Sequence, residues 1–401
     1  MIGAALEGAP HLHHTIPMKH TLTALFALLL FTAAAQARDG KVKVFILAGQ
    51  SNMEGKGFPE PVAWQLSQPK YRDRYKHFIK DGDFDSFTKK HQASIEADPK
   101  RPFYDWSERE DVWINYLGRH GNLTVGYASP SRCFGPEYNF GHVVGDHFDE
   151  QVLLIKCAWG GKSLGRDFRP PSAGLPTDAE FEEMVKEKNA QITKNNEKNP
   201  DKQKPLTTVA ELKEPYGYFY REMMKEVRGT LDNLKERFPS YEGQGYELAG
   251  FVWFQGWNDQ FTEDWYKSYG EHMACLISDV REELKAPDMK FVIGQVGFDG
   301  PRESKPAKDG GPSARDHIKS GQLAMATRKG FKGSVAVVKT DQYWDMEADA
   351  IYNGPGGWSE DVDKWRQFGN DRPYHYLGSP WFFAQTGAGF GEAMVRLHGK
   401  K

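Results

Sequence analysis

A serine that directly follows a predicted buried strand is the first candidate for chemistry in this chain. The apolar run Val42–Ala48 ends at Gly49, and Gln50, Ser51 and Asn52 come next. Open α/β sheets place nucleophiles at the carboxyl ends of such strands, where a glycine lets the chain turn sharply. We therefore predict Ser51 as a nucleophile, with Gln50 and Asn52 facing the substrate crevice. A strand followed by an ordinary polar turn is the alternative interpretation.

A serine nucleophile also needs a base and donors for an oxyanion, and candidates follow other apolar runs. Gly160 and Gly161 come after the run 152–158, and their small size would let backbone N–H groups approach a substrate oxygen. Gln255 and Asn258 come after the run 248–254, and an amide side chain can donate without losing a proton. His375, near the end of the chain, is the candidate base.

A second serine competes for the role of nucleophile. Residues 161–165 read GKSLG, which matches the GxSxG pattern of a nucleophile elbow and also follows an apolar run. In that interpretation the chain is an α/β-hydrolase-type esterase that uses Ser163. So short a pattern often arises by chance, and it leaves the residues around Ser51 and Gln255 unexplained.

The elements that must position these groups follow a strand–helix alternation. Near-continuous hydrophobicity predicts strands covered on both faces, in five runs: Val42–Ala48, Val152–Ala158, Leu248–Phe254, Phe291–Val296 and Ser334–Lys339. Helical spacing of apolar residues is found at Tyr138–Phe148, Tyr218–Phe238, Asp264–Leu284, Arg315–Arg328 and Trp381–Leu397. The alternation predicts an α/β fold, a doubly wound three-layer sandwich with a parallel sheet.

Two segments interrupt this alternation and are predicted as loop insertions. Residues 58–124 are charged and rich in aromatic side chains, and they follow the Ser51 loop directly, so they could wall the site. Residues 169–208 contain a run dense in Lys, Asn and Glu, which is typical of a partly helical surface excursion.

The beginning of the chain predicts an export signal rather than part of the fold. A basic start at residues 18–20 precedes the apolar segment 21–35 and a small-x-small pattern at Ala35–Ala37. We expect residues 1–37 to be an upstream extension and signal peptide, and residues 38–401 to form one domain. The product would be secreted or periplasmic after cleavage near Ala37, with no membrane contact beyond the signal peptide.

Charge and cysteine content exclude some classes of site. The net charge of −3 does not suggest a basic surface for nucleic acid. The three cysteines, Cys133, Cys157 and Cys275, match no zinc spacing, and they could form at most one disulfide. We expect no metal and no cofactor.

The ordered blocks resemble the SGNH hydrolase superfamily, and more narrowly its sialate O-acetylesterase-like group, which overlaps carbohydrate esterase family six. The resemblance rests on ILAGQSNMEG, FGPEYNFG, WGGKSLG, GFVWFQGWND and YHYLGS, which span residues 46–379. It implies a flavodoxin-like sheet of five parallel strands, with Ser51 as nucleophile and His375 as base. It also implies an oxyanion hole formed by the N–H groups of Ser51, Gly160 and Gly161 and the Gln255 amide.

The chain departs from the family pattern in two places. Members often carry Asp three residues before the histidine, whereas this chain has Arg372 there and Asp371 one residue earlier. Asp371 could orient His375, or the site could be a dyad, or another acid such as Asp259 could serve. The usual Glu after the third-strand Gln-Gly is Trp257, which is either a sugar-stacking platform or a core residue.

The sequence therefore predicts a secreted serine esterase that removes O-acetyl groups from an acetylated carbohydrate through an acyl-enzyme. The alternative from another class is a carbohydrate-binding protein that keeps the fold and has impaired catalysis. The departures at Arg372 and Trp257 motivate that alternative.

Overall fold

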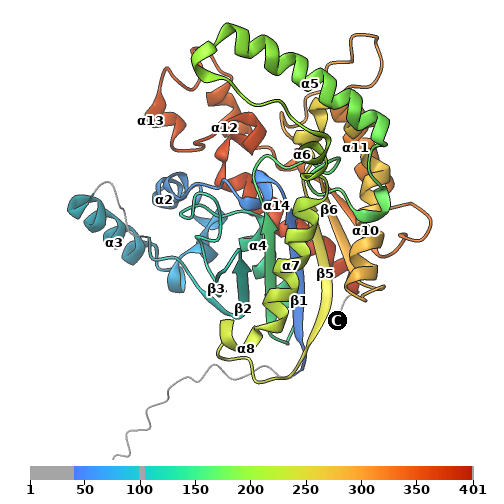
Figure 1. Cartoon of the computed structure of the whole chain (residues 1–401). Coiled ribbons are helices and arrows are strands. Elements are labelled where there is room, and N and C mark those ends of the chain that lie inside the picture. Colours follow the sequence, from blue (N-terminus) through green and yellow to red (C-terminus); the bar gives the residue numbers. More distant parts are fainter. Residues whose placement is uncertain (1–39, 99–103, 400–401) are drawn as a thin grey trace, which may run out of the picture. The chain divides into compact units, whose positions relative to one another are not determined.

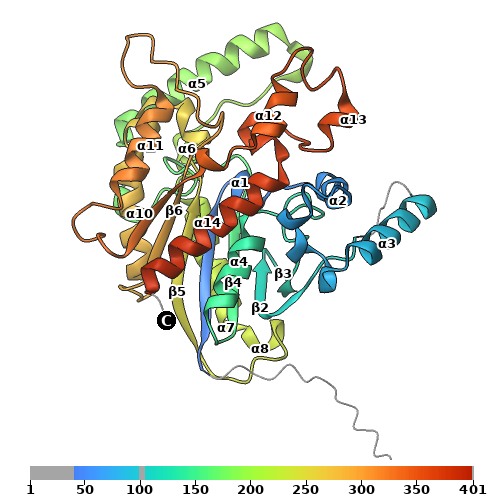
Figure 2. The ribbon, with the colours of Figure 1, turned by 180° about the vertical axis from the view of Figure 1, so that it is seen from behind.

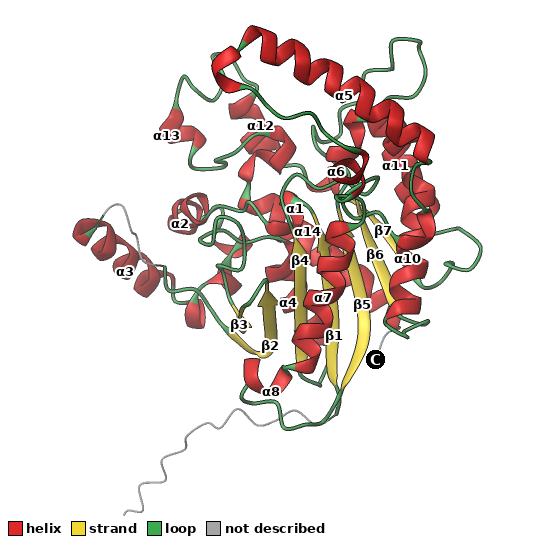
Figure 3. Cartoon of the chain, viewed as in Figure 1, coloured by secondary structure: helices red, strands yellow, loops and turns green. Residues whose placement is uncertain are grey.

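The strands form one sheet that is wider than the sequence suggested. The computed structural model describes residues 40–98 and 104–399, so the predicted upstream extension and signal peptide lie outside the described residues. The sheet has seven strands in the order β3-β2-β4-β1-β5-β6-β7 (Figures 1 and 3). Their bounds are β1 Val42–Gly49, β2 Arg109–Tyr116, β3 Arg119–Leu123, β4 Val152–Ala158, β5 Tyr246–Phe254, β6 Lys290–Gln295 and β7 Val335–Lys339.

The five predicted strands are present as β1, β4, β5, β6 and β7, and every pairing among them is parallel. The expected number of strands was wrong because the segment 58–124 supplies two more. Strand β2 pairs in parallel with β4, and β3 returns antiparallel to β2 at the sheet edge. Part of that segment is therefore sheet rather than insertion.

Helices cover both faces of the sheet. Helices α4 (Pro136–His147) and α14 (Pro380–His398) pack on each other on one face, seen in front in Figure 2. Helices α7 (Tyr218–Asp232) and α10 (Tyr269–Glu283) lie on the other face, in front in Figure 1. This is the layered α/β arrangement that the strand–helix alternation predicted.

The remaining helices are short or peripheral. They are α1 Ser51–Glu54, α2 Pro59–Ser67, α3 Phe84–Ala97, α5 Asp178–Lys198, α6 Val209–Lys213, α8 Leu234–Arg237, α9 Glu263–Lys267, α11 Ala314–Ala324, α12 Met346–Tyr352 and α13 Val362–Trp365. Helix α5 lies in the predicted excursion 169–208; it begins with a capping box between Thr177 and Glu180 and buries only Phe181. In the part of the chain that the structure describes, no helix is long and apolar enough to cross a membrane.

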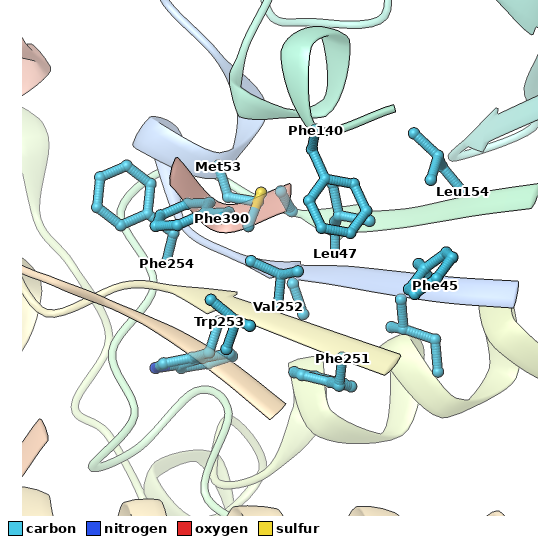
Figure 4. Close-up of a cluster of buried hydrophobic side chains, with 14 of the residues drawn as sticks. Phe45, Leu47, Met53, Phe140, Leu154, Phe251, Val252, Trp253, Phe254 and Phe390 are labelled. Atoms are coloured by element: carbon cyan, nitrogen blue, oxygen red, sulfur yellow. The ribbon is translucent and has the colours of Figure 1, made fainter. Parts of the chain in front are cut away.

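The core explains why the strands read as continuous apolar runs. Phe45 in β1 meets Phe140 of α4 edge-to-face, with ring centroids 5.5 Å apart, and Phe254 in β5 meets Phe390 of α14 at 5.4 Å (Figure 4). Trp253, the neighbour of Phe254, points to the opposite face and is also fully buried. Consecutive residues are therefore apolar because both faces of the sheet are covered.

Candidate active site

The carboxyl ends of the three central strands meet beside Ser51. Gly49, the last residue of β1, lies opposite Ala158 of β4 and Phe254 of β5. A Cβ at Gly49 would lie 2.1 Å from the carbonyl oxygen of Phe254, so only glycine fits this close approach. The chain then enters α1, whose first residue is Ser51, at the sheet edge where open α/β sheets bind ligands.

Ser51, His375 and Asp371 form a hydrogen-bonded chain. The Ser51 Oγ lies 3.0 Å from His375 Nε2, and His375 Nδ1 lies 3.0 Å from Asp371 Oδ2. Ser51 is 7% exposed, so its hydroxyl lies at the floor of the site rather than on an open surface. The order of nucleophile, base and acid is that of a serine hydrolase triad, and it can remove the Ser51 proton during attack on a carbonyl carbon.

The loop that carries the acid and the base folds on itself. The Leu377 N–H donates to the Arg372 carbonyl at 3.0 Å, and the Asp371 N–H donates to the Leu377 carbonyl at 3.1 Å. These bonds turn the chain so that Asp371 reaches His375 although they are four residues apart and separated by Pro373. The spacing that departs from the family pattern therefore still yields an acid–base pair.

Left-handed backbone follows the histidine directly. Tyr376 has φ 50° and Leu377 has φ 63°, a conformation that costs free energy for residues other than glycine. The Tyr376 ring stacks on Phe382 with centroids 3.7 Å apart, and its hydroxyl oxygen accepts a bond from the Gly297 N–H at 3.0 Å. The packing of Tyr376 thus holds the turn that presents His375.

The Asp371 carboxylate is kept ionised in this environment. Burial acts to raise its pKa, but the hydrogen bond and positive charge of His375 and the Arg372 N–H outweigh burial, so the pKa lies below its ordinary value. An ionised acid fixes the His375 tautomer with the proton on Nδ1 and stabilises the imidazolium that forms during catalysis.

Three groups are candidates for the oxyanion hole. The N–H groups of Ser51 and Gly161 have no hydrogen-bond partner among the described residues. Gly161 has φ 70°, a left-handed conformation that favours glycine. The Asn258 Nδ2 donates to the Gly161 carbonyl at 2.7 Å, which leaves its second N–H for a ligand. The Gly160 N–H, in contrast, already donates to Glu54 Oε1 at 2.9 Å.

The side chains of Gln255 and Gln50 are buried beside the site and are hydrogen-bonded within the protein. The Gln255 Nε2 lies 3.1 Å from Gln50 Oε1, 2.9 Å from the Lys162 carbonyl and 2.6 Å from Asp259 Oδ2. Both glutamines are 2% exposed. Because an amide has only two N–H groups, none remains for an oxyanion. The arrangement therefore argues against the oxyanion role predicted for Gln255 and the substrate contact predicted for Gln50.

The two remaining predicted contacts, Asn52 and Trp257, have different positions. Asn52 is 5% exposed, and its Nδ2 donates to the Tyr374 carbonyl at 3.0 Å, so it ties α1 to the histidine loop rather than reaching solvent. Trp257 is partly exposed, and its ring lies against those of Phe298 and Tyr374. Trp257 therefore has exposed ring surface that a ligand could touch, whereas Asn52 has little exposed surface.

The competing serine has a structural role. Ser163 is 1% exposed, and its hydroxyl donates to Asp167 Oδ2 at 2.8 Å. Within the described residues no histidine contacts this hydroxyl, so Ser163 has no base. Asp259, the other acid considered for the triad, accepts hydrogen bonds from Gln255 and from the Leu164 and Gly165 N–H groups instead of contacting His375.

A buried ion pair supports α1 and was missed from the sequence. Lys156 and Glu137 are both fully buried, with Lys156 Nζ 2.7 Å from Glu137 Oε2. The same ammonium donates to the carbonyls of Glu54, at the end of α1, and Tyr127. The sequence feature that could have indicated this ion pair is Lys156 itself, a lysine inside an otherwise apolar strand. A charge in that position needs a buried partner of opposite sign.

The described residues hold no cluster of three or more His, Cys, Asp or Glu side chains suited to a metal ion. The cysteines Cys133, Cys157 and Cys275 are free thiols, so the disulfide that the sequence allowed is not formed.

Comparison with known proteins assigns the family. The family described as carbohydrate esterase, sialic acid-specific acetylesterase matches residues 41–199 and 207–340. The chain belongs to this family. The matched residues of the carbohydrate esterase family include Ser51, Gly161 and Asn258, whereas Asp371 and His375 lie beyond them. The family match therefore does not extend to Asp371 and His375, whose hydrogen bonds in the structure are the observation that links them to Ser51.

The similarity to solved structures is distant. One from Arabidopsis thaliana is 13% identical, with 89% of this chain and 98% of that chain covered and a TM-score of 0.44. XAC1771, a novel carbohydrate acetylesterase from Xanthomonas citri, is 12% identical, with 88% of this chain and 55% of that chain covered and a TM-score of 0.43. NanS is 14% identical, with 81% of this chain and 84% of that chain covered and a TM-score of 0.34. No curated protein matches the sequence. Similarities this weak carry no functional conclusion.

Proposed function

We propose that this carbohydrate esterase is a serine hydrolase that removes acetyl groups from carbohydrate hydroxyls through an acyl-enzyme. The observation that carries the proposal is the continuous chain from Ser51 Oγ through His375 to Asp371, with both links at 3.0 Å. Membership of the carbohydrate esterase family supports the substrate class.

In the first half-reaction the Ser51 oxygen attacks the acetyl carbonyl carbon while His375 Nε2 takes the serine proton. The negative charge that develops on the carbonyl oxygen is met by the Ser51 and Gly161 N–H groups and the free Asn258 N–H. The tetrahedral intermediate then breaks its bond to the sugar oxygen, which receives the proton from His375 as it leaves.

In the second half-reaction water attacks the acetyl-Ser51 ester. His375 takes a proton from the water and returns it to the Ser51 oxygen, so acetate leaves and the enzyme is restored. Asp371 remains ionised throughout and holds the imidazole in place.

The test compares two buried serines. We expect Ser51→Ala to lower hydrolysis of an aryl acetate and of an acetylated methyl glycoside by at least about 10³-fold, since the nucleophile is lost. Ser163→Ala is the matched control and should retain activity within a few-fold, because its hydroxyl only bonds Asp167. Full activity of Ser51→Ala would refute the proposal.

We also propose that the chain is exported, on the strength of residues 18–37 alone. N-terminal sequencing of the protein from its native host tests this. A mature N-terminus near residue 38 is expected, and a retained N-terminus upstream of residue 21 would contradict it.

A further inference from the structure

Aromatic rings gather on one side of His375. We define the aromatic cluster as Trp257, Phe261, Phe298 and Tyr374. The Trp257 ring centroid lies 4.6 Å from that of Phe298, 5.4 Å from that of Tyr374 and 5.9 Å from that of Phe261. The Tyr374 ring in turn lies 4.6 Å from the His375 ring, so the aromatic cluster begins at the base itself.

Two members of the aromatic cluster are exposed. Phe261 is 69% exposed and Tyr374 is 38% exposed, while Phe298 beneath them is buried. Single exposed apolar side chains are ordinary on protein surfaces, but a contiguous group supported from below marks a binding surface. Because it is continuous with His375, whatever covers it also lies beside the ester that Ser51 attacks.

A polar pocket of about 350 Å³ extends the aromatic cluster. Phe298 lines this pocket together with Gln260, Asp299, Arg302 and Arg315. Arg302 bonds Asp349, and Arg315 lies 3.2 Å from Asp299. The other charged lining residues, Glu303 and Lys305, are opposite in sign. The pocket therefore offers hydrogen bonds without a large net charge. An apolar surface beside such a pocket matches a sugar ring, which has C–H faces and a rim of hydroxyl groups.

We propose that the aromatic cluster is a subsite for the neutral pyranose ring of the acetylated glycan, with Phe261 and Trp257 as specificity-determining residues. This rests on the proposed esterase function and adds to it. The sugar ring lies against the exposed aromatic faces and directs its hydroxyl groups toward the polar pocket. The enzyme therefore selects substrates by the sugar that carries the ester as well as by the acetyl group.

The experiment compares Phe261→Ala with Tyr246→Ala. Tyr246 is 40% exposed and lies at the start of β5, opposite Val42, at the far end of the sheet from Ser51. Two substrates are used: a mono-O-acetylated neutral methyl hexopyranoside and ethyl acetate, which has no ring. For Phe261→Ala we expect the ratio of kcat/KM for the glycoside to that for ethyl acetate to fall about 3- to 10-fold, mainly through KM. For Tyr246→Ala the ratio should not change.

An unchanged ratio in Phe261→Ala, or an equal loss on both substrates, would overturn the subsite. A preference of more than tenfold for an acetylated methyl uronate over the neutral glycoside would overturn the assignment to a neutral ring. Failure of the esterase function itself gives a different result, because neither ester would then be hydrolysed by the unaltered protein. Binding of the neutral glycoside to Ser51→Ala, weakened by Phe261→Ala, would in that case still support the subsite.

Discussion

Asp371→Asn tests whether the carboxylate four residues before His375 is the acid of the triad. In the structure Asp371 Oδ1 accepts a bond from the Arg372 N–H at 2.7 Å, and Oδ2 faces His375 Nδ1. The asparagine carbonyl would keep the bond from Arg372, because an NH₂ cannot accept it. The amide N–H would then point at Nδ1 and place the imidazole proton on Nε2. Such an imidazole cannot accept the proton of Ser51.

The expected loss follows from this change of tautomer. An acid-to-amide replacement with intact geometry lowers kcat by about 10⁴-fold, or about 5.5 kcal/mol at 1.36 kcal/mol for each factor of ten. The assay is steady-state hydrolysis of an aryl acetate, with urea unfolding to verify that the variant is folded. Arg372→Ala is the control, since it keeps the backbone N–H and should remain within a few-fold. A loss below tenfold in Asp371→Asn would refute the assignment and indicate a dyad.

Two further predictions concern buried charges. Lys156→Met should lower the free energy of unfolding by about 3–5 kcal/mol in a urea titration, because Glu137 stays buried without its partner. The double variant Lys156→Met/Glu137→Leu should recover part of that loss, because the buried charge is removed while the carbonyls of Glu54 and Tyr127 still lack their donor, and equal stability of the single and double variants would contradict the argument. Burial raises the pKa of Asp259 from 3.8 to about 6, so the folded state binds more protons than the unfolded state between these values. The stability of the unaltered protein relative to Asp259→Asn should therefore fall as pH rises from about 4 to 6, and a rise over this range would be inconsistent with the raised pKa.

The strands that could be predicted are those whose residues are apolar on both faces. Val152–Ala158 and Leu248–Phe254 read as strands because both sides of the sheet are covered by helices. Strand β2 begins with Arg109, Glu110 and Asp111 and is buried only from Val112 onward, so its pattern did not stand out. Strand β3, which reads RHGNL, is an edge strand with little burial and gives no hydrophobic signal.

The candidate site was predictable in its sequence order and less so in its hydrogen bonds. The positions of Ser51 and His375 follow from where the first strand ends and where the last helix begins. Whether an amide points into the site depends on contacts between distant segments. Gln255 is turned inward by Asp259 and Gln50, and the Gly160 N–H is taken by Glu54, which is 106 positions earlier. A local sequence pattern does not reveal hydrogen bonds between residues that are this far apart in the chain.

The linear order of the proposed triad has a consequence for biosynthesis. Ser51 and His375 are 324 positions apart, and the histidine turn is held by Phe382 in α14, which packs on α4. During translation the proposed base, His375, is made 324 positions after the proposed nucleophile, Ser51, and Phe382, which supports the histidine turn, follows it. A nascent or truncated chain that lacks this segment has a serine without a base. If Ser51, His375 and Asp371 act as proposed, hydrolysis requires that the segment from Asp371 to Phe382 has been made and has folded against the strand and helix that carry Ser51.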